Sequence, residues 1–128
     1  EQLSLILKGN DGGRQWPERI AVRTGVRMTF LRVCTIEWLQ SEGNYVRLFA
    51  NGSAQLVRGT MNGIQDKLDP GQFLRIHRSA IVNIDFIKEL RARRTGDYTV
   101  RMLGGKEFTL TRTYRSSLAR LLEAVPPA

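Results

Sequence analysis

Cysteine and histidine are nearly absent from this chain of 128 residues, which has one of each, Cys34 and His77. A single cysteine cannot form an internal disulfide, and it fits a reducing, cytoplasmic compartment. We expect Cys34 to be a small buried hydrophobe rather than a redox sensor. One histidine and one cysteine also lack the ligand spacing of a structural zinc site. The sequence therefore predicts neither a disulfide scaffold nor a metal centre.

Features typical of enzymes and membrane proteins are missing as well. No stretch approaches the roughly 18 apolar residues of a membrane span, and no signal peptide is visible. No glycine-rich loop precedes a helix, the acidic residues are scattered, and Ser79 is too weak a signal to pair with His77 as a nucleophile. The sequence predicts a protein without catalytic residues and without a cofactor. Because the chain opens on Glu1 and not on Met, we expect a processed product or a piece of a longer protein.

Acidic residues are outnumbered by basic ones, and the excess indicates an anionic partner. The chain has 20 Lys and Arg against 12 Asp and Glu, a net charge of +8. Between residues 72 and 115, ten basic residues stand against four acidic ones, so this segment carries +6 of that charge. A basic excess of this kind favours nucleic acid, although many small soluble domains are basic without binding it.

The N-terminal residues 1–18 read as a linker or the end of a preceding module. Leu3–Lys8 fits either a strand or the tail of a helix, and the Asn, Gly and Pro residues that follow are typical of a turn. The compact domain is predicted over residues 19–123, with a tail at residues 124–128.

Short strands dominate the rest of the chain. The clearest signal is Asn51-Gly52 between two alternating segments, which predicts a two-residue hairpin because both turn positions need positive φ. Alternation in YVRLFA places Tyr45, Arg47 and Phe49 on one side and the residues between them on the other. Helices are expected only at residues 60–68, with Thr60 as N-cap, and at residues 113–123. The pattern predicts a mainly β protein of antiparallel sheets, not a doubly wound fold.

Polar and basic residues gather at three strand ends. In FLRIHRSAIVN, residues 73–83, apolar segments flank His77, Arg78 and Ser79. In SEGNYVRL, residues 41–48, Asn44, Tyr45 and Arg47 follow Gly43. In TLTRTYRSSL, residues 109–118, Arg112 and Arg115 lie where a strand meets a helix. Loops of this kind above a β scaffold suit DNA recognition. Each also has a purely structural explanation: a histidine that fixes a turn, a type I′ or bulged hairpin, and a solvated helix start.

Four blocks in this order resemble the LytTR-type DNA-binding domain of bacterial transcription regulators. They are IEWLQSEGNYVRL, RGTMNGIQDKL, FLRIHRSAIVNIDFIKEL and GGKEFTLTRTYRSSL, and the similarity covers about residues 19–122. The resemblance implies an elongated arrangement of small antiparallel sheets with short helices. It also implies loops that enter successive major grooves, often of paired direct repeats bound by a dimer, and a signal-receiving or membrane module upstream.

The resemblance further implies which positions face DNA. They form three sets. In the second set, His77 is expected to hold the turn in place and Arg78 to contact DNA. The candidates are Asn44, Tyr45, Val46 and Arg47; His77, Arg78 and Ser79; Arg112 and Arg115. Many family members carry Ser-Arg where this chain has Thr111-Arg112, and the hydroxyl is kept.

The sequence thus predicts a cytoplasmic, sequence-specific double-stranded-DNA-binding domain of a bacterial two-component response regulator. The alternatives are a protein-interaction or anti-regulator module that kept the fold without binding DNA, and an RNA or polyanion binder. Arginine at both Arg78 and Arg112 favours DNA.

Overall fold

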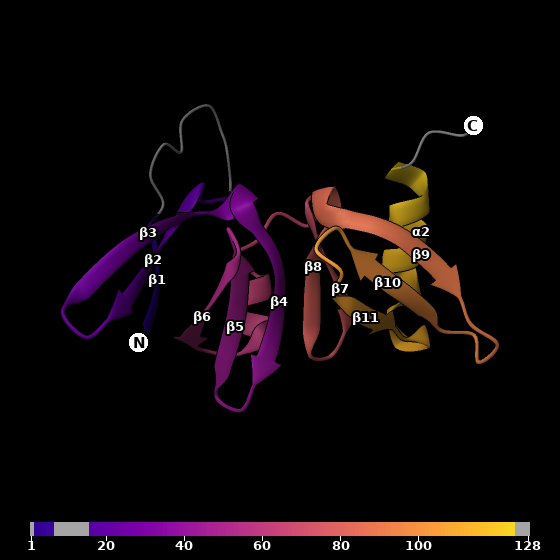
Figure 1. The fold of residues 1–128 in the computed structure, drawn as a ribbon, viewed down its shortest axis with the longest axis horizontal. Coiled ribbons are helices and arrows are strands. Elements are labelled where there is room, and N and C mark those ends of the chain that lie inside the picture. Colours follow the sequence, from indigo (N-terminus) through magenta and orange to yellow (C-terminus); the bar gives the residue numbers. More distant parts are fainter. Residues whose placement is uncertain (1, 7–15, 125–128) are drawn as a thin grey trace.

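The protein is mainly β and elongated, as the sequence and the resemblance predict (Figure 1). The computed structural model describes residues 2–6 and 16–124. The strands of the first half are β1 (Gln2–Ile6), β2 (Arg19–Thr24), β3 (Arg27–Arg32), β4 (Ile36–Glu42), β5 (Tyr45–Ala50) and β6 (Ser53–Arg58). Those of the second half are β7 (Phe73–His77), β8 (Ala80–Asn83), β9 (Ile87–Ala92), β10 (Tyr98–Met102) and β11 (Glu107–Leu110).

These strands form two sheets that are almost wholly antiparallel. The larger sheet has eight strands in the order β3-β2-β1-β6-β5-β4-β8-β7, and the smaller has the order β11-β10-β9. The exception is the parallel contact of β1 with β6, which consists of a single residue pair, Gln2 and Arg58. The large sheet is therefore a chain of smaller antiparallel units, as the fold class predicted.

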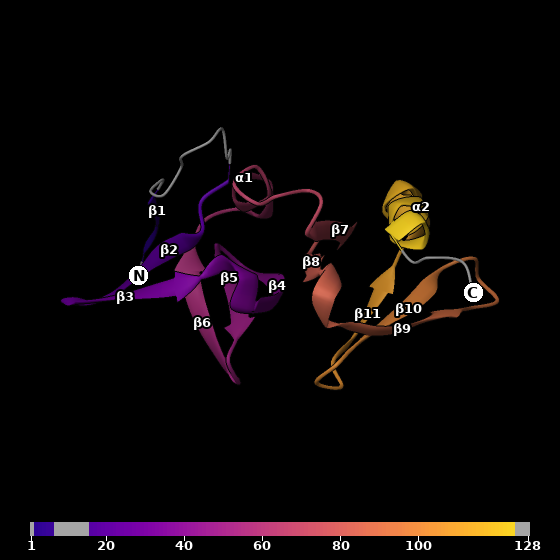
Figure 2. The ribbon, with the colours of Figure 1, turned by 90° about the horizontal axis from the view of Figure 1, so that it is seen from above.

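The helices are short and lie on the same side of the strands (Figure 2). Helix α1 (Met61–Gln65) begins after Thr60, whose Oγ1 accepts a hydrogen bond from the Gly63 N–H at 3.0 Å, so the predicted N-cap is confirmed. It is shorter than the nine residues predicted. Helix α2 (Arg115–Ala124) closes the chain. Three 3₁₀ turns complete the elements: η1 (Val33–Thr35), η2 (Ile84–Phe86) and η3 (Arg112–Tyr114).

Turn chemistry explains the hairpins. Asn51 and Gly52 have φ of +54° and +79°, the left-handed pair that a two-residue turn between β5 and β6 requires. The strand predicted around DFIKEL begins two residues late, at Ile87, because η2 occupies its start. There Asn83 Oδ1 accepts a hydrogen bond from the Asp85 N–H at 3.0 Å.

Two hydrophobic cores hold the molecule, and the strands β4, β7 and β8 lie between them. On β4, Leu39 belongs to the first core and Trp38 to the second. On β8, Ile81 belongs to the first core, and Ala80 and Val82 belong to the second. Burial on both faces explains why β8 carries three successive apolar residues without alternation. The Trp38 ring stacks on Phe49 at 5.0 Å between centroids.

Cys34 is exposed, so its predicted burial is wrong. It lies in η1, where the chain turns between β3 and β4. This turn directs Val33 and Ile36 inward, with 8% and 0% of their surface exposed, and leaves Cys34 facing solvent. A short 3₁₀ turn has no strand alternation, and therefore the apolar neighbours of Cys34 did not reveal its side.

The predicted domain start at Arg19 remains a prediction, but β1 lies before it and pairs antiparallel with β2 over five residue pairs. Leu3–Lys8 thus contributes a strand at its first four residues. Of the predicted tail, Ala124 ends α2, and residues 125–128 lie outside the described part. No helix among the described residues is long and apolar enough to cross a membrane.

Candidate nucleic-acid interface

The three strand-end junctions singled out by the sequence lie along one side of the molecule. They are the β4–β5 turn at Gly43 and Asn44, the β7–β8 turn at Arg78 and Ser79, and η3 before α2. Figure 1 shows all three along its lower edge. Backbone hydrogen bonds tie them together: the Ser41 N–H donates to Ser79 O at 2.9 Å, and the Thr111 N–H donates to Ile76 O at 3.2 Å. The fold thus gathers residues from three parts of the sequence into one surface.

His77 braces the β7–β8 turn. The Ser79 backbone N–H donates to His77 Nδ1 at 3.1 Å, and the Ser79 hydroxyl lies 2.9 Å from the same nitrogen. These bonds close the turn from inside, as predicted for the histidine. Arg78 lies at the tip, exposed, and no described residue bonds to its guanidinium. The turn therefore exposes the Arg78 guanidinium on a loop that the hydrogen bonds of His77 hold in place.

Arg75 is the residue that sequence reasoning missed. Its Nε donates to His77 O at 2.9 Å, and its Nη2 donates to Arg78 O. Its Nη1 donates to Asn62 Oδ1 at 2.9 Å and to Gln65 Oε1 at 2.6 Å, both on α1. Arg75 therefore connects the β7–β8 turn to the first half of the domain. No sequence signal could have found it, because its α1 partners precede it by 10 and 13 residues.

The β4–β5 turn is built around Gly43, whose φ is +63°. Asn44 follows it, exposed, and Asn44 O accepts a hydrogen bond from the Gly59 N–H at 3.2 Å. Positive φ at Gly43 supports the structural role of this glycine, while the Asn44 side chain stays available. The turn thus carries an amide that can both donate and accept.

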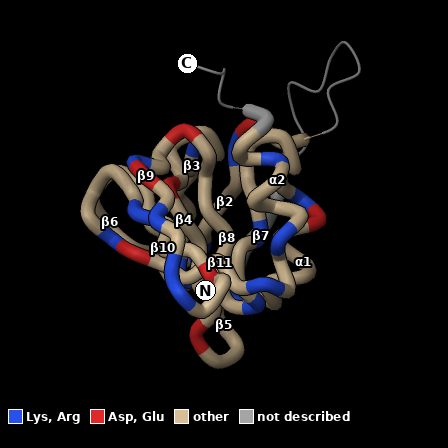
Figure 3. The backbone as a smooth tube through the Cα atoms, turned by 90° about the vertical axis from the view of Figure 1, so that its right-hand side faces the viewer, with Lys and Arg blue, Asp and Glu red and all other residues tan. Residues whose placement is uncertain are grey.

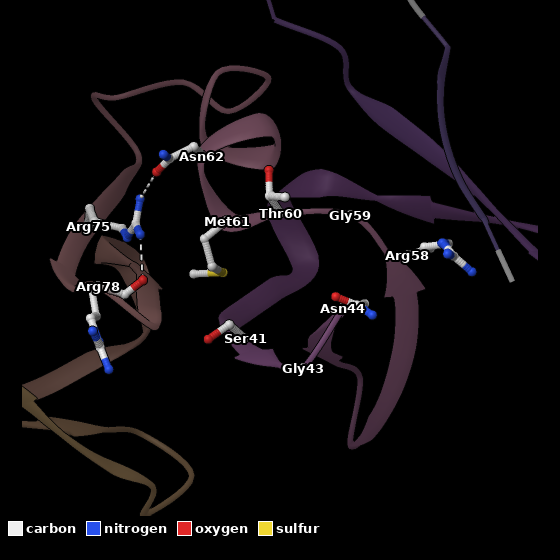
Figure 4. A pocket seen from close by; sticks show the side chains of 10 residues that line it. All are labelled: Ser41, Gly43, Asn44, Arg58, Gly59, Thr60, Met61, Asn62, Arg75 and Arg78. Atoms are coloured by element: carbon white, nitrogen blue, oxygen red, sulfur yellow. Dashed lines mark hydrogen bonds between the residues drawn. The ribbon is translucent and has the colours of Figure 1, made fainter.

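A pocket of about 540 Å³ lies between these two turns (Figure 4). Figure 4 shows the Asn44 turn on one side and Arg75 and Arg78 on the other, with Met61 between them. Three arginines and several uncharged polar groups line it: Ser41, Gly43, Asn44, Arg58, Gly59, Thr60, Met61, Asn62, Arg75 and Arg78. Asn44 and Arg78, 34 positions apart in the sequence, therefore share one cavity.

One candidate in the first set, Val46, differs from the prediction, and another, Arg47, is ion-paired. Val46 has 0% of its surface exposed and belongs to the first core, so its side chain cannot contact DNA in this fold. It lies on the buried side of β5, opposite Tyr45 and Arg47, and the strand alternation predicted that these residues lie on opposite sides. Arg47 pairs with Glu42, with Nη2 2.5 Å from Oε1, and its charge is largely offset. Tyr45 is half-buried.

The third junction presents two free arginines. Arg112 is exposed in η3, and its aliphatic stem lies close to Gly96, where an added Cβ would be 3.3 Å from Arg112 Cδ. Arg115 is exposed at the first residue of α2. No described residue binds either guanidinium. These side chains can therefore meet an external anion without first breaking an ion pair.

Basic residues outnumber acidic ones at this end of the molecule. Figure 3 views it end-on and shows Lys and Arg on both sides of β11. Among the described residues at this end, Arg91 and Arg101 have acidic partners, at 3.0 Å from Glu89 and 3.9 Å from Glu107. Within residues 2–6 and 16–124, no three His, Cys, Asp or Glu side chains group into a possible metal site. The surface suits a polyanion.

A family model and several known proteins match this chain. The family model described as "LytTr DNA-binding domain" matches residues 26–123. The chain is 28% identical over 117 residues to the "Sensory transduction protein LytT" of Bacillus subtilis (strain 168), covering 91% of this chain and 48% of that protein. It is 27% identical over 82 residues to the "CO-responsive transcriptional regulator RcoM" of Rhodospirillum rubrum, covering 64% of this chain and 35% of that protein.

A solved structure shares the fold. It is the "LytTr DNA-binding domain of putative methyl-accepting/DNA response regulator from Bacillus cereus", with a TM-score of 0.73 and 19% identity. The match covers 82% of this chain and 96% of that one. The chain spans about half the length of the Bacillus subtilis relative, so that protein contains a further region of comparable size.

Proposed function

The chain belongs to the LytTR family of DNA-binding domains, and on this basis we propose that it is the DNA-binding output domain of a bacterial transcription regulator. It binds double-stranded DNA sequence-specifically and inserts its strand-end turns into the major groove. The observation that carries this proposal is the pocket that brings Asn44 and Arg78 together at one edge. The proposal includes no catalytic step and no cofactor.

Arg78 and Asn44 are proposed to read bases. A free arginine fork can donate two hydrogen bonds to the O6 and N7 of guanine, and an asparagine amide can pair with the N6 and N7 of adenine. Both side chains are exposed on short turns that backbone hydrogen bonds hold in place. Arg112 and Arg115 are proposed to bind phosphate or a base edge beside them. Ser79 and Tyr45 support the turns, and Tyr45 offers a hydroxyl at the rim.

Turns rather than a helix are proposed to enter the groove. Helix α1 has five residues and is therefore only about 7.5 Å long, too short to follow a groove. Helix α2 buries Leu118 and Leu121 in the second core. The turns, by contrast, project from the ends of strands and carry the free polar side chains.

The longer relatives suggest how the domain is used. We propose that a signal-receiving or membrane module precedes it in a two-component regulator, and that the regulator acts in the bacterial cytoplasm. Binding as a dimer on paired direct repeats remains part of the proposal. Two bound copies would together read twice as many bases as one domain.

Selection of bound sequences from a random duplex pool tests the proposal. We expect a recovered motif with one or two strongly constrained positions per domain, and paired motifs at a fixed spacing if a dimer binds. A pool that stays random after selection, with protein shown to be folded, would overturn sequence-specific binding.

Exposed apolar residues favour a second candidate, a protein-interaction module. Val26 and Phe30, at the β2–β3 hairpin, have 107% and 53% of their surface exposed, and this hairpin forms one edge of the large sheet. Exposed apolar edges bind other proteins. In that case the wild type would select no duplex motif, Val26→Ser with Phe30→Ser would abolish partner binding, and Arg78→Ala would leave partner binding unchanged.

A further inference from the structure

A closed ring of hydrogen bonds surrounds the pocket between the two turns. It runs from Asn44 O to the Gly59 N–H, through α1, to the Arg75 guanidinium, and on to the β7–β8 turn. The Ser79 carbonyl then accepts from the Ser41 N–H, which returns the ring to the β4–β5 turn. Every link is a backbone segment, a backbone hydrogen bond or a hydrogen bond of the Arg75 side chain. The ring is therefore a frame that spans both turns.

Arg75 is the side chain that closes this frame. Its guanidinium makes four hydrogen bonds, two to α1 and two to carbonyls of the β7–β8 turn. It also lies over the Tyr114 ring, with Cζ 5.8 Å from the centroid. With four donors engaged and one face covered, Arg75 has little left to offer a phosphate. Figure 4 shows it directed at Asn62 and the Arg78 carbonyl.

We propose that Arg75 is a positioning residue, which fixes the distance and orientation of the Arg78 turn relative to the Asn44 turn. The inference rests on the proposed DNA binding and names what controls its specificity. Arg75 touches no base. It acts through Arg78, whose carbonyl it holds and whose side chain it thereby aims.

Arginine is required for geometric reasons. A planar guanidinium presents five N–H donors in a fixed fork, which can serve α1 and the turn at the same time. A lysine ammonium has three donors at one point and cannot reach acceptors on both sides. Arg75→Lys therefore keeps the positive charge but breaks the ring of hydrogen bonds. The variant distinguishes a positioning role of Arg75 from a purely electrostatic one.

The experiment compares Arg75→Lys with Arg120→Lys in the whole chain. Arg120 is a matched control, because it also donates to a backbone carbonyl, that of Pro70, but lies outside the ring. Affinities for the selected duplex and a scrambled duplex are measured at a temperature where melting curves show each variant folded. Arg75→Lys should weaken cognate binding about tenfold, the effect of one charged hydrogen bond, and leave scrambled binding within about twofold. Arg120→Lys should change neither.

The double variant tests whether Arg75 acts through Arg78. In an Arg78→Ala background, Arg75→Lys should weaken cognate binding by less than about twofold, because the two residues share one effect. The slope of log affinity against log salt for Arg75→Gln, which removes the charge, should match that of the wild type. A slope reduced by about 0.9 would show a direct phosphate contact and overturn the proposal. Equal losses on cognate and scrambled duplexes, or full additivity with Arg78→Ala, would also overturn it.

Two exposed acceptors allow the same test if Arg75→Lys does not fold. Asn62→Ala with Gln65→Ala removes the α1 side of the ring and leaves Arg75 in place. Cognate affinity should fall in the same direction, by about threefold or more. No loss in this folded variant would refute the ring as a positioning frame. Failure of the wild type to bind any duplex would instead refute the proposed function itself.

Discussion

His77 and Arg78 are adjacent, yet the structure predicts that their loss has different consequences. Arg78 is exposed, and no described residue holds its guanidinium. Arg78→Ala should therefore change the free energy of unfolding by less than about 0.5 kcal/mol. If Arg78 reads a base, the same change should cost about 1–3 kcal/mol on the cognate duplex, roughly 5- to 150-fold in Kd, and relax preference at one position.

His77→Ala should instead act on stability. It removes the acceptor of the Ser79 N–H and the partner of the Ser79 hydroxyl. Two such hydrogen bonds contribute about 1–3 kcal/mol together. For a domain of this size, 1 kcal/mol shifts Tm by about 4 °C, so Tm should fall by about 4–12 °C. Binding should weaken on all sequences alike, because the turn becomes less ordered while the Arg78 side chain is still present.

The assay is thermal melting of each variant, together with affinities for cognate and scrambled duplexes. Arg32→Ala is the control for charge, since Arg32 is an exposed arginine at the end of β3, outside the candidate site. If Arg78→Ala lowered Tm while His77→Ala changed only sequence preference, the assigned roles would be reversed. If neither changed DNA affinity, the β7–β8 turn would not be part of the interface.

Three further predictions concern the whole domain. If about five phosphates are neutralised, log affinity should fall against log salt with a slope of about −4 to −5, and a slope near zero would remove the electrostatic model. Cys34→Ala should leave stability within about 0.5 kcal/mol, since Cys34 is exposed, and binding should be equal under oxidant and reductant; oxidation that abolished binding only in the wild type would make it a sensor. Asn83 is fully buried, and its Nδ2 donates to Ile36 O at 2.7 Å, so Asn83→Ala should cost about 2–4 kcal/mol in urea unfolding. A cost below about 1 kcal/mol would show that water replaces the amide.

Local signals predicted the hairpins well, because each turn depends on its own residues. Asn51-Gly52 is the clearest case, since its positive φ values are a property of the dipeptide. The same reasoning placed the helix cap at Thr60 and the three polar junctions at strand ends. Cys34 was assigned wrongly because a 3₁₀ turn, not a strand, sets its direction.

Contacts between distant segments were not predictable in the same way. Arg75 sits between apolar residues of β7 like any partly solvated arginine, and only the packing of α1 beside β7 supplies its acceptors. Val46 shows the opposite error. Its alternation with Tyr45 and Arg47 placed it on the opposite side of the strand from them, whereas the family resemblance implied DNA contact for the whole Asn44–Arg47 region.

The strands shared between the two cores make the domain one cooperative unit. Without β7 and β8 the first core would lose Phe73 and Ile81, and without β4 the second would lose Trp38. Neither half can therefore melt while the other remains intact, and a single two-state transition should be observed by every probe. DNA bound at the turns should raise the temperature of that one transition for every probe. The Trp38 indole fluorescence is one such probe, because its ring lies between the two halves.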